Sequence, residues 1–265
     1  MGSTELAALL ADARSCVVFT GAGISTESGI PDFRSPGGVW SRYDPRDFTF
    51  SRYVRSPEVR ELSWRMRYEL WQSAPRPNPA HRVLADLEAR GLIVGVITQN
   101  IDGLHQDAGS RRVVEIHGSS RDVLCIGASP RTGTPQGCGF KAPHEWAYEL
   151  LEAGALDPPC PECGGIVKTG TVSFGQNLYP DVLEEAGALT RGADLLVAIG
   201  SSLQVHPAAG IPTTAQEAGA ALAIINDEPT PLDDAADLVV RGRAGEVLPE
   251  VTRMIDDDND RSRSE

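Results

Sequence analysis

The stretch of residues 16–34 limits the possible folds of this chain more than any other part of the sequence. It starts with an apolar run at 16–20, typical of a buried strand, which ends in Gly-Ala-Gly at 21–23. Glycines at a strand end let the backbone approach a phosphate, and the N–H groups that follow can bind the anion. The usual dinucleotide motif, Gly-x-Gly-x-x-Gly, is incomplete, because Thr26 stands in its last position. The sequence therefore predicts a phosphate-binding strand end of a less common type.

The same stretch ends in Pro31, Asp32, Phe33 and Arg34. Proline fixes the turn, and the next three residues place a carboxylate, an aromatic ring and a guanidinium on one loop. A ring and a guanidinium suit a planar cationic ligand that also carries phosphates. We therefore expect this loop to lie against a nucleotide.

Apolar runs and helical patterns alternate along much of the chain. Continuous apolar runs, typical of strands in a parallel sheet, recur at 92–97, 195–199 and 221–225, with shorter ones at 113–116 and 238–240. Helical patterns separate these runs. The alternation predicts a Rossmann-like, doubly wound α/β domain with a parallel sheet.

Polar segments follow three of these runs directly, at 98–102, at His117 and at 200–202. Ligands of such sheets bind beyond the carboxyl ends of the strands. We therefore expect these three segments to share one site with residues 21–34.

Two segments interrupt the α/β pattern. Residues 35–77 are rich in aromatic residues and arginines and predict an inserted, mostly helical module that lies over the nucleotide loop. Residues 119–167 hold four of the five cysteines and predict a zinc-binding module. The Rossmann-like, nucleotide-binding domain is then expected to comprise 1–34, 78–118 and 168–255.

The four cysteines of the second module predict a structural zinc site. Cys160 and Cys163 form a knuckle, Cys-Pro-Glu-Cys-Gly-Gly, in which two thiolates reach one tetrahedral ion. Their expected partners are Cys125 and Cys138, which a Gly-, Pro-, Ser- and Thr-rich insertion separates; loop closure depends only weakly on length. Because this half lacks the tight spacing, His144 is an alternative to Cys125. Four thiolates leave no position open for chemistry, so the metal is interpreted as structural.

Composition limits the classes of partner. The net charge of −13 over 265 residues provides no basic patch, which argues against direct nucleic-acid binding. The charge suits basic protein substrates, although solubility alone also explains it. No apolar run is long enough for a membrane helix, and no targeting segment is visible, so we expect a cytoplasmic protein. The acidic segment 256–265 has no apolar residue and is expected to be a disordered tail.

Residues 21–34, Gly-Ala-Gly-Ile-Ser-Thr-Glu-Ser-Gly-Ile-Pro-Asp-Phe-Arg, resemble the first motif of the sirtuin family without a gap. The family's later motifs follow in order: Thr-Gln-Asn-Ile-Asp at 98–102, His-Gly at 117–118, Phe-Gly at 174–175, Gly-Ser-Ser-Leu at 200–203 and Ile-Asn at 225–226. The resemblance covers about residues 5–255. It implies a bacterial-type NAD-dependent protein-lysine deacetylase or deacylase, with NAD as co-substrate and one structural zinc. The products would be nicotinamide, free lysine and O-acyl-ADP-ribose.

The resemblance also implies roles for single residues. His117 matches the general base, and a neutral imidazole can take up a proton near neutral pH. Asn100 is the second expected catalytic residue, Phe33 would screen the cleaved ribose from water, and Asp102 would hold ribose and nicotinamide or cap a helix. The residues implied to bind the cofactor are Gly21, Ala22, Gly23, Ser25, Asp32, Phe33, Arg34, Gln99, Asn100, Ile101, Asp102, Gly200, Ser201, Ser202, Asn226 and Ala244.

By the same resemblance the substrate is an acylated lysine in an extended segment of a protein. Residues 174–175 and 205–207 would flank it as extended edges, between which a peptide can add as a strand. A protein ADP-ribosyltransferase on the same scaffold and a non-catalytic NAD-sensing module are the alternatives.

The expected acyl group is uncharged. Sirtuins that remove malonyl or succinyl groups carry a Tyr-x-x-Arg pair in the helical module, and we expect no such acyl-binding pair in residues 35–77. Residues 53–64 instead resemble the class II branch of the family. We expect Arg67 to be an exposed helix residue, although it would meet an acidic acyl group if it turned inward.

Overall fold

The computed structural model describes residues 2–127 and 137–264. Within them, six parallel strands form one sheet in the order β3-β2-β1-β7-β8-β9. The strands are β1 Cys16–Thr20, β2 Gly95–Thr98, β3 Val113–Glu115, β7 Leu195–Ile199, β8 Ala221–Ile225 and β9 Leu238–Val240. The predicted parallel sheet is confirmed.

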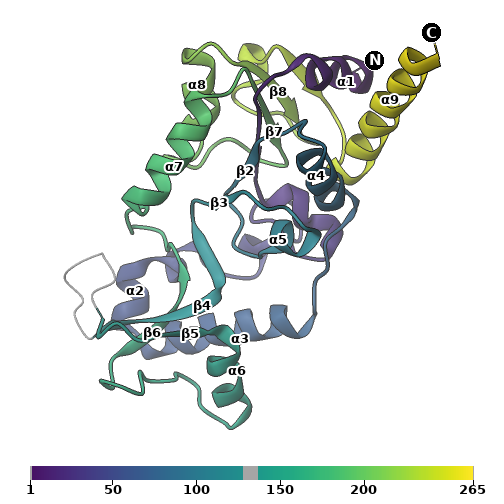
Figure 1. Cartoon of the computed structure of the whole chain (residues 1–265). Coiled ribbons are helices and arrows are strands. Elements are labelled where there is room, and N and C mark those ends of the chain that lie inside the picture. Colours follow the sequence, from purple (N-terminus) through teal and green to yellow (C-terminus); the bar gives the residue numbers. More distant parts are fainter. Residues whose placement is uncertain (1, 128–136, 265) are drawn as a thin grey trace.

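Helices cover both faces of this sheet (Figure 1). On one face lie α1 Gly2–Asp12, α4 Pro79–Ala89 and α9 Ala244–Ser264, and on the other α7 Pro180–Arg191 and α8 Gly210–Glu217. Alternate residues of β1 serve the two layers, because Val18 packs into the first core and Val17 and Phe19 into the second. A strand buried on both faces explains the uninterrupted apolar run.

The ends of β1 and β7 meet backbone to backbone. Gly23 N donates to Gly200 O at 2.8 Å, at the start of the short 3-10 helix η1, Ala22–Ser28, which turns the chain away. A Cβ atom on Gly21 would lie 2.8 Å from Gly200 O, and one on Gly23 would lie 2.8 Å from Gly200 Cα. No side chain fits between the two strand ends, so glycine is required on both sides of the contact.

The two inserted modules form the lower part of the molecule (Figure 1). The helical module contains η2 Val39–Ser41, η3 Pro45–Phe48, α2 Phe50–Arg55 and α3 Pro57–Gln72. The second module contains an antiparallel sheet, in the order β5 Lys141–Pro143, β4 Gly118–Gly127 and β6 Ile166–Thr171, together with α6 His144–Glu152. Two smaller elements, α5 Leu104–Ala108 and η4 Asp233–Ala235, belong to the large sheet domain.

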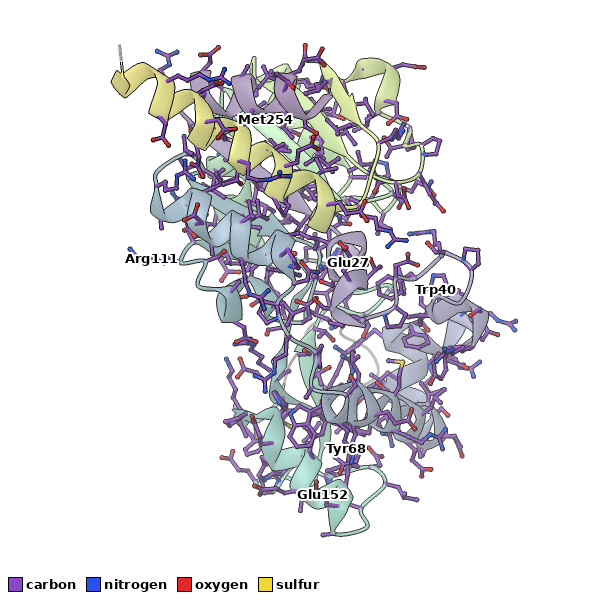
Figure 2. All side chains as sticks on the ribbon, turned by 90° about the vertical axis from the view of Figure 1, so that its right-hand side faces the viewer. Glu27, Trp40, Tyr68, Arg111, Glu152 and Met254 are labelled. Carbon is purple, nitrogen blue, oxygen red and sulfur yellow. The ribbon has the colours of Figure 1, made fainter. Side chains whose placement is uncertain are left out.

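These two modules share one core. Trp64 of α3 is 1% exposed and packs with Val123 and Val167 of the small sheet. Figure 2 shows Tyr68 of α3 beside Glu152 of α6, whose carboxylate accepts a hydrogen bond from the Tyr68 hydroxyl at 2.8 Å. The modules therefore support each other as one lobe beneath the sheet.

Two predicted boundaries differ from the structure. Strand β6 ends at Thr171, so it crosses the boundary expected between residues 167 and 168. Helix α9 continues to Ser264, through the segment that was expected to be disordered. Asp256 accepts from Arg90 at 2.8 Å, and this ion pair ties the start of that extension to the residue that caps the end of α4. Among the described residues, no helix has the length and apolar character needed to cross a membrane.

Candidate active site

A cleft of ≈1940 Å³ lies between the large sheet domain and the lower lobe. Every residue expected to bind NAD or to catalyse lines this cleft, from Gly21 to Ala244. The residues come from the segments that follow β1, β2, β3, β7 and β8 and from the start of α9. The carboxyl ends of the strands therefore converge as the sequence predicted.

His117 has a defined tautomer. Its Nδ1 lies 2.9 Å from the backbone oxygen of Gln99, and a carbonyl oxygen can only accept, so Nδ1 carries the proton. The other nitrogen, Nε2, is then the unprotonated one. Burial lowers the pKa of His117, and the hydrogen bond to Gln99 opposes part of this shift. A neutral, proton-accepting imidazole is the resulting state at neutral pH.

Ser25 is the centre of a directed hydrogen-bond network. Its hydroxyl donates to Asp102 Oδ2 at 2.8 Å and accepts from Asn100 Nδ2 at 3.1 Å. The same Asn100 amide reaches Gly21 O at 3.1 Å. Asp102 Oδ1 accepts from Leu104 N at 2.9 Å, so this carboxylate also precedes and orients α5, and burial raises its pKa. The expected ribose-binding and helix-capping roles of Asp102 are thus compatible.

Two buried histidines behind this network were not singled out from the sequence. His81 Nδ1 accepts from Asn78 N at 3.4 Å, which leaves Nε2 as the protonated nitrogen, 3.5 Å from Ser25 Oγ. The ring of His105 lies 4.9 Å from that of His81. Burial lowers the pKa of His81 to about 4 and that of His105 to about 3, so both rings are neutral. The Asn78 cap signal predicted α4 but gave no sign of this contact.

Asp32 acts within its own loop. Its Oδ1 accepts from the backbone N–H groups of Arg34 and Ser35, at 3.0 and 2.8 Å, and its Oδ2 accepts from the Ser35 hydroxyl at 2.5 Å. This turn presents the Phe33 ring, which is 42% exposed, and directs Arg34 Nη1 to Ser202 Oγ at 3.3 Å. Asp32 therefore shapes the loop, while the ring and the guanidinium face the cleft.

The four predicted cysteines come together. All four sulfur atoms lie within 4.8 Å of one another, with Cys125 3.6 Å from Cys163 and Cys138 3.5 Å from Cys160. Thiolates around a tetrahedral zinc at about 2.3 Å are about 3.8 Å apart, so the cluster fits one zinc ion. His144 instead points its Nδ1 at Arg121 O, 3.0 Å away, and is not part of the cluster. Residues 128–136 of the insertion lie outside the described part of the chain.

Arg67 departs from its expected exposure. Its Nη2 donates to Thr171 Oγ1 at 3.2 Å, and the side chain lines the cleft. Burial lowers the pKa of Arg67, and the nearby Tyr148 and Tyr53 partly oppose this shift. The expectation of an exposed helix arginine is therefore wrong.

Comparison with known proteins gives the family. A sequence model of the Sir2 family matches residues 21–207. The chain belongs to the Sir2 family. It is 47% identical over 241 residues to NAD-dependent protein deacetylase 2 of Streptomyces coelicolor, covering 89% of this chain and 95% of that protein. It is 43% identical to the NAD-dependent protein deacylase of Aeropyrum pernix, covering 95% and 96%.

Solved structures of Sir2 proteins have the same fold. One described as "Sir2-p53 peptide-NAD+" superimposes with a TM-score of 0.84 at 38% identity, over 96% of this chain and 98% of that one. Another, described as "Structure of Sir2Tm bound to a propionylated peptide", gives 0.83 at the same identity and coverage. The sirtuin resemblance of the motifs thus extends to the fold of nearly the whole chain.

We expect this Sir2-family chain to hold one zinc per molecule. Replacing Cys160 and Cys163 together by serine should abolish zinc binding and lower the thermal midpoint sharply, since structural zinc contributes directly to folding. Replacing Cys16, buried in β1 and remote from the cluster, by serine provides a control that should keep its zinc. Metal analysis of purified protein decides the matter, and active wild-type protein without zinc would contradict the assignment.

Proposed function

We propose that this chain is an NAD-dependent protein-lysine deacetylase or deacylase. The observation that carries the proposal is the fixed tautomer of His117, whose proton-accepting Nε2 belongs to the cleft that also holds the glycine strand ends and the Ser25 network. Relatives of both names, deacetylase and deacylase, support it. The relatives at 47% and 43% identity cover most of this chain and most of their own length, so the proposal concerns the chain as a whole and not one segment of it.

Different residues of the cleft bind different parts of NAD. The backbone at 21–23 lines the cleft with only the small side chain of Ala22, which fits the close approach of the pyrophosphate. Residues 200–202, 226 and 244 line the adenosine end, and Ser25, Asn100 and Asp102 line the nicotinamide end. NAD, when bound, supplies a ribose carbon whose bond to nicotinamide can be broken.

The chain's own groups then control protons and water. His117 accepts a proton from a ribose hydroxyl at Nε2, because Nδ1–H is already engaged by Gln99. The Ser25 network keeps the Asn100 amide and the Asp102 carboxylate in one orientation throughout. The exposed ring of Phe33 lines the cleft, where it screens the reacting carbon from water.

The protein substrate presents an acylated lysine from an extended segment. Residues 172–176 and 204–207 both line the cleft, and they offer two edges between which a peptide strand fits. Incubating an acetyl-lysine peptide with and without NAD and weighing the products tests the proposal. Loss of the acetyl mass supports it, whereas a gain of ADP-ribose on the peptide or an unchanged mass would point to the transferase or to the sensing module.

Replacing His117 by alanine should remove catalysis and keep the cofactor. General-base catalysis contributes roughly 10²- to 10⁴-fold, so we expect kcat to fall by at least ~100-fold. The affinity for NAD and the thermal midpoint should stay close to those of the wild type, and both are measured as controls. Deacylation at the wild-type rate in this variant would exclude His117 as the base.

The position of Arg67 changes the set of acyl groups that we expect the cleft to accept. Among the described residues no carboxylate pairs with this guanidinium, and its one hydrogen bond goes to the neutral hydroxyl of Thr171. A desolvated cation without an acid is best stabilised by an anionic ligand. We therefore propose that the cleft accepts acyl groups ending in a carboxylate, such as succinyl, besides acetyl.

Replacing Arg67 by methionine tests this range. We expect kcat/KM for a succinyl-lysine peptide to fall by about tenfold or more, because a charge-assisted hydrogen bond is lost, and kcat/KM for the acetyl form to change little. Arg65 is exposed on the same helix, so Arg65→Met is the matched control and should leave both values unchanged. Equal losses on the two peptides after Arg67→Met would show that the guanidinium does not recognise the acyl group.

A further inference from the structure

Lys168 is an unusual cation for this chain. The sequence contains only two lysines, Lys141 and Lys168, among 24 cationic residues. The side chain of Lys141 is 63% exposed and pairs with Asp122, whereas Lys168 is 3% exposed. Burying an ammonium group is costly unless strong partners replace its water, so these partners indicate what the residue does.

The partners of Lys168 are backbone oxygens of its own strand. Its Nζ donates to Thr169 O at 3.2 Å and to Thr171 O, and Thr171 Oγ1 lies 3.4 Å away. No carboxylate among the described residues pairs with it, and burial, followed by the nearby Arg67, lowers its pKa. The two carbonyls are two residues apart, and therefore point to the same side of β6, where one ammonium reaches both.

The pairing of β6 with β4 is irregular at this point. Gly118 pairs with Thr171 and Val123 pairs with Thr169, so four residues of β4 stand opposite the single residue 170 of β6. A regular ladder cannot satisfy the strand here. Lys168 supplies donors where the ladder is interrupted, and it fixes the backbone course of residues 169–171.

The fixed segment leads directly into the wall of the active-site cleft. Val172 N donates to His117 O at 2.7 Å, and Phe174 exchanges hydrogen bonds with Phe48 O and Phe50 N, at 3.2 and 2.9 Å. Residues 172–176 then line the cleft, as do residues 204–207. The course of residues 169–171 therefore sets where this edge lies relative to His117, which follows β3.

We propose that Lys168 is a positioning residue for the peptide-binding edge at 172–176. It acts through the carbonyls of Thr169 and Thr171 and touches neither NAD nor the acyl-lysine. Without the ammonium these buried carbonyls lose their donors, and the edge shifts relative to His117. The proposal rests on the proposed function only in taking this edge as the one that receives the peptide.

The test compares Lys168→Met with Lys168→Arg and the surface control Lys141→Met. Equilibrium binding of an acetyl-lysine peptide is measured first, because it needs no turnover, followed by KM and kcat for peptide and NAD. For Lys168→Met we expect peptide Kd and KM to rise about tenfold, with kcat and the KM for NAD within about threefold of the wild type. The arginine variant keeps N–H donors and should restore most of the peptide affinity, and Lys141→Met should match the wild type.

Other results would overturn the proposal. Unchanged peptide affinity in Lys168→Met would show that Lys168 has no role in peptide binding. An equal loss of peptide and NAD affinity would show a general structural role. If the methionine variant does not fold, Lys168→Gln, which keeps two N–H donors without charge, is judged by the same ratio of peptide to NAD affinity. A wild type that binds the peptide but does not deacylate it would refute the proposed function, and the binding ratios would still decide the role of Lys168.

Discussion

The backbone contact between the ends of β1 and β7 is the constraint on which the site depends. Gly23 and Gly200 meet at hydrogen-bond distance, and a Cβ atom at Gly21, Gly23 or Gly200 would lie within 3 Å of a backbone atom of the other strand end. The contact brings the start of η1 and residues 200–202 to one place at the centre of the sheet, where the strand order reverses. Binding a pyrophosphate there requires bare backbone, and the packing of the two strands requires the same.

The tautomers of two histidines near this contact are fixed, because the hydrogen bond at each Nδ1 can run in only one direction. A carbonyl oxygen accepts from His117 Nδ1, and a backbone N–H donates to His81 Nδ1, so the two rings carry their protons on opposite nitrogens. His117 offers a lone pair to the cleft, whereas His81 offers a proton toward Ser25. The Ser25 hydroxyl therefore donates its single proton to Asp102. Burial keeps both rings neutral, so the network has one arrangement at neutral pH.

The parallel sheet and the cleft at its carboxyl edge could be predicted from the sequence, because the apolar runs and the motif at 21–34 are each compatible with few structures. The sequence left the fourth zinc ligand open between Cys125 and His144, since spacing does not show which side chains meet across an insertion. Arg67 was misplaced although it stands three residues after the buried Trp64 and shares its helix face, a signal that was available. The extension of α9 and the role of Lys168 depend on partners from elsewhere in the fold, which no local pattern reveals.

The central claim is that one cleft couples cleavage of NAD to removal of an acyl group from lysine. The most direct measurement follows free nicotinamide and deacetylated peptide in the same reaction, over time and with limiting peptide. The account predicts one nicotinamide for each acetyl group removed, and little nicotinamide when the peptide is omitted. Nicotinamide release at the same rate without peptide, or deacetylation without NAD, would contradict it.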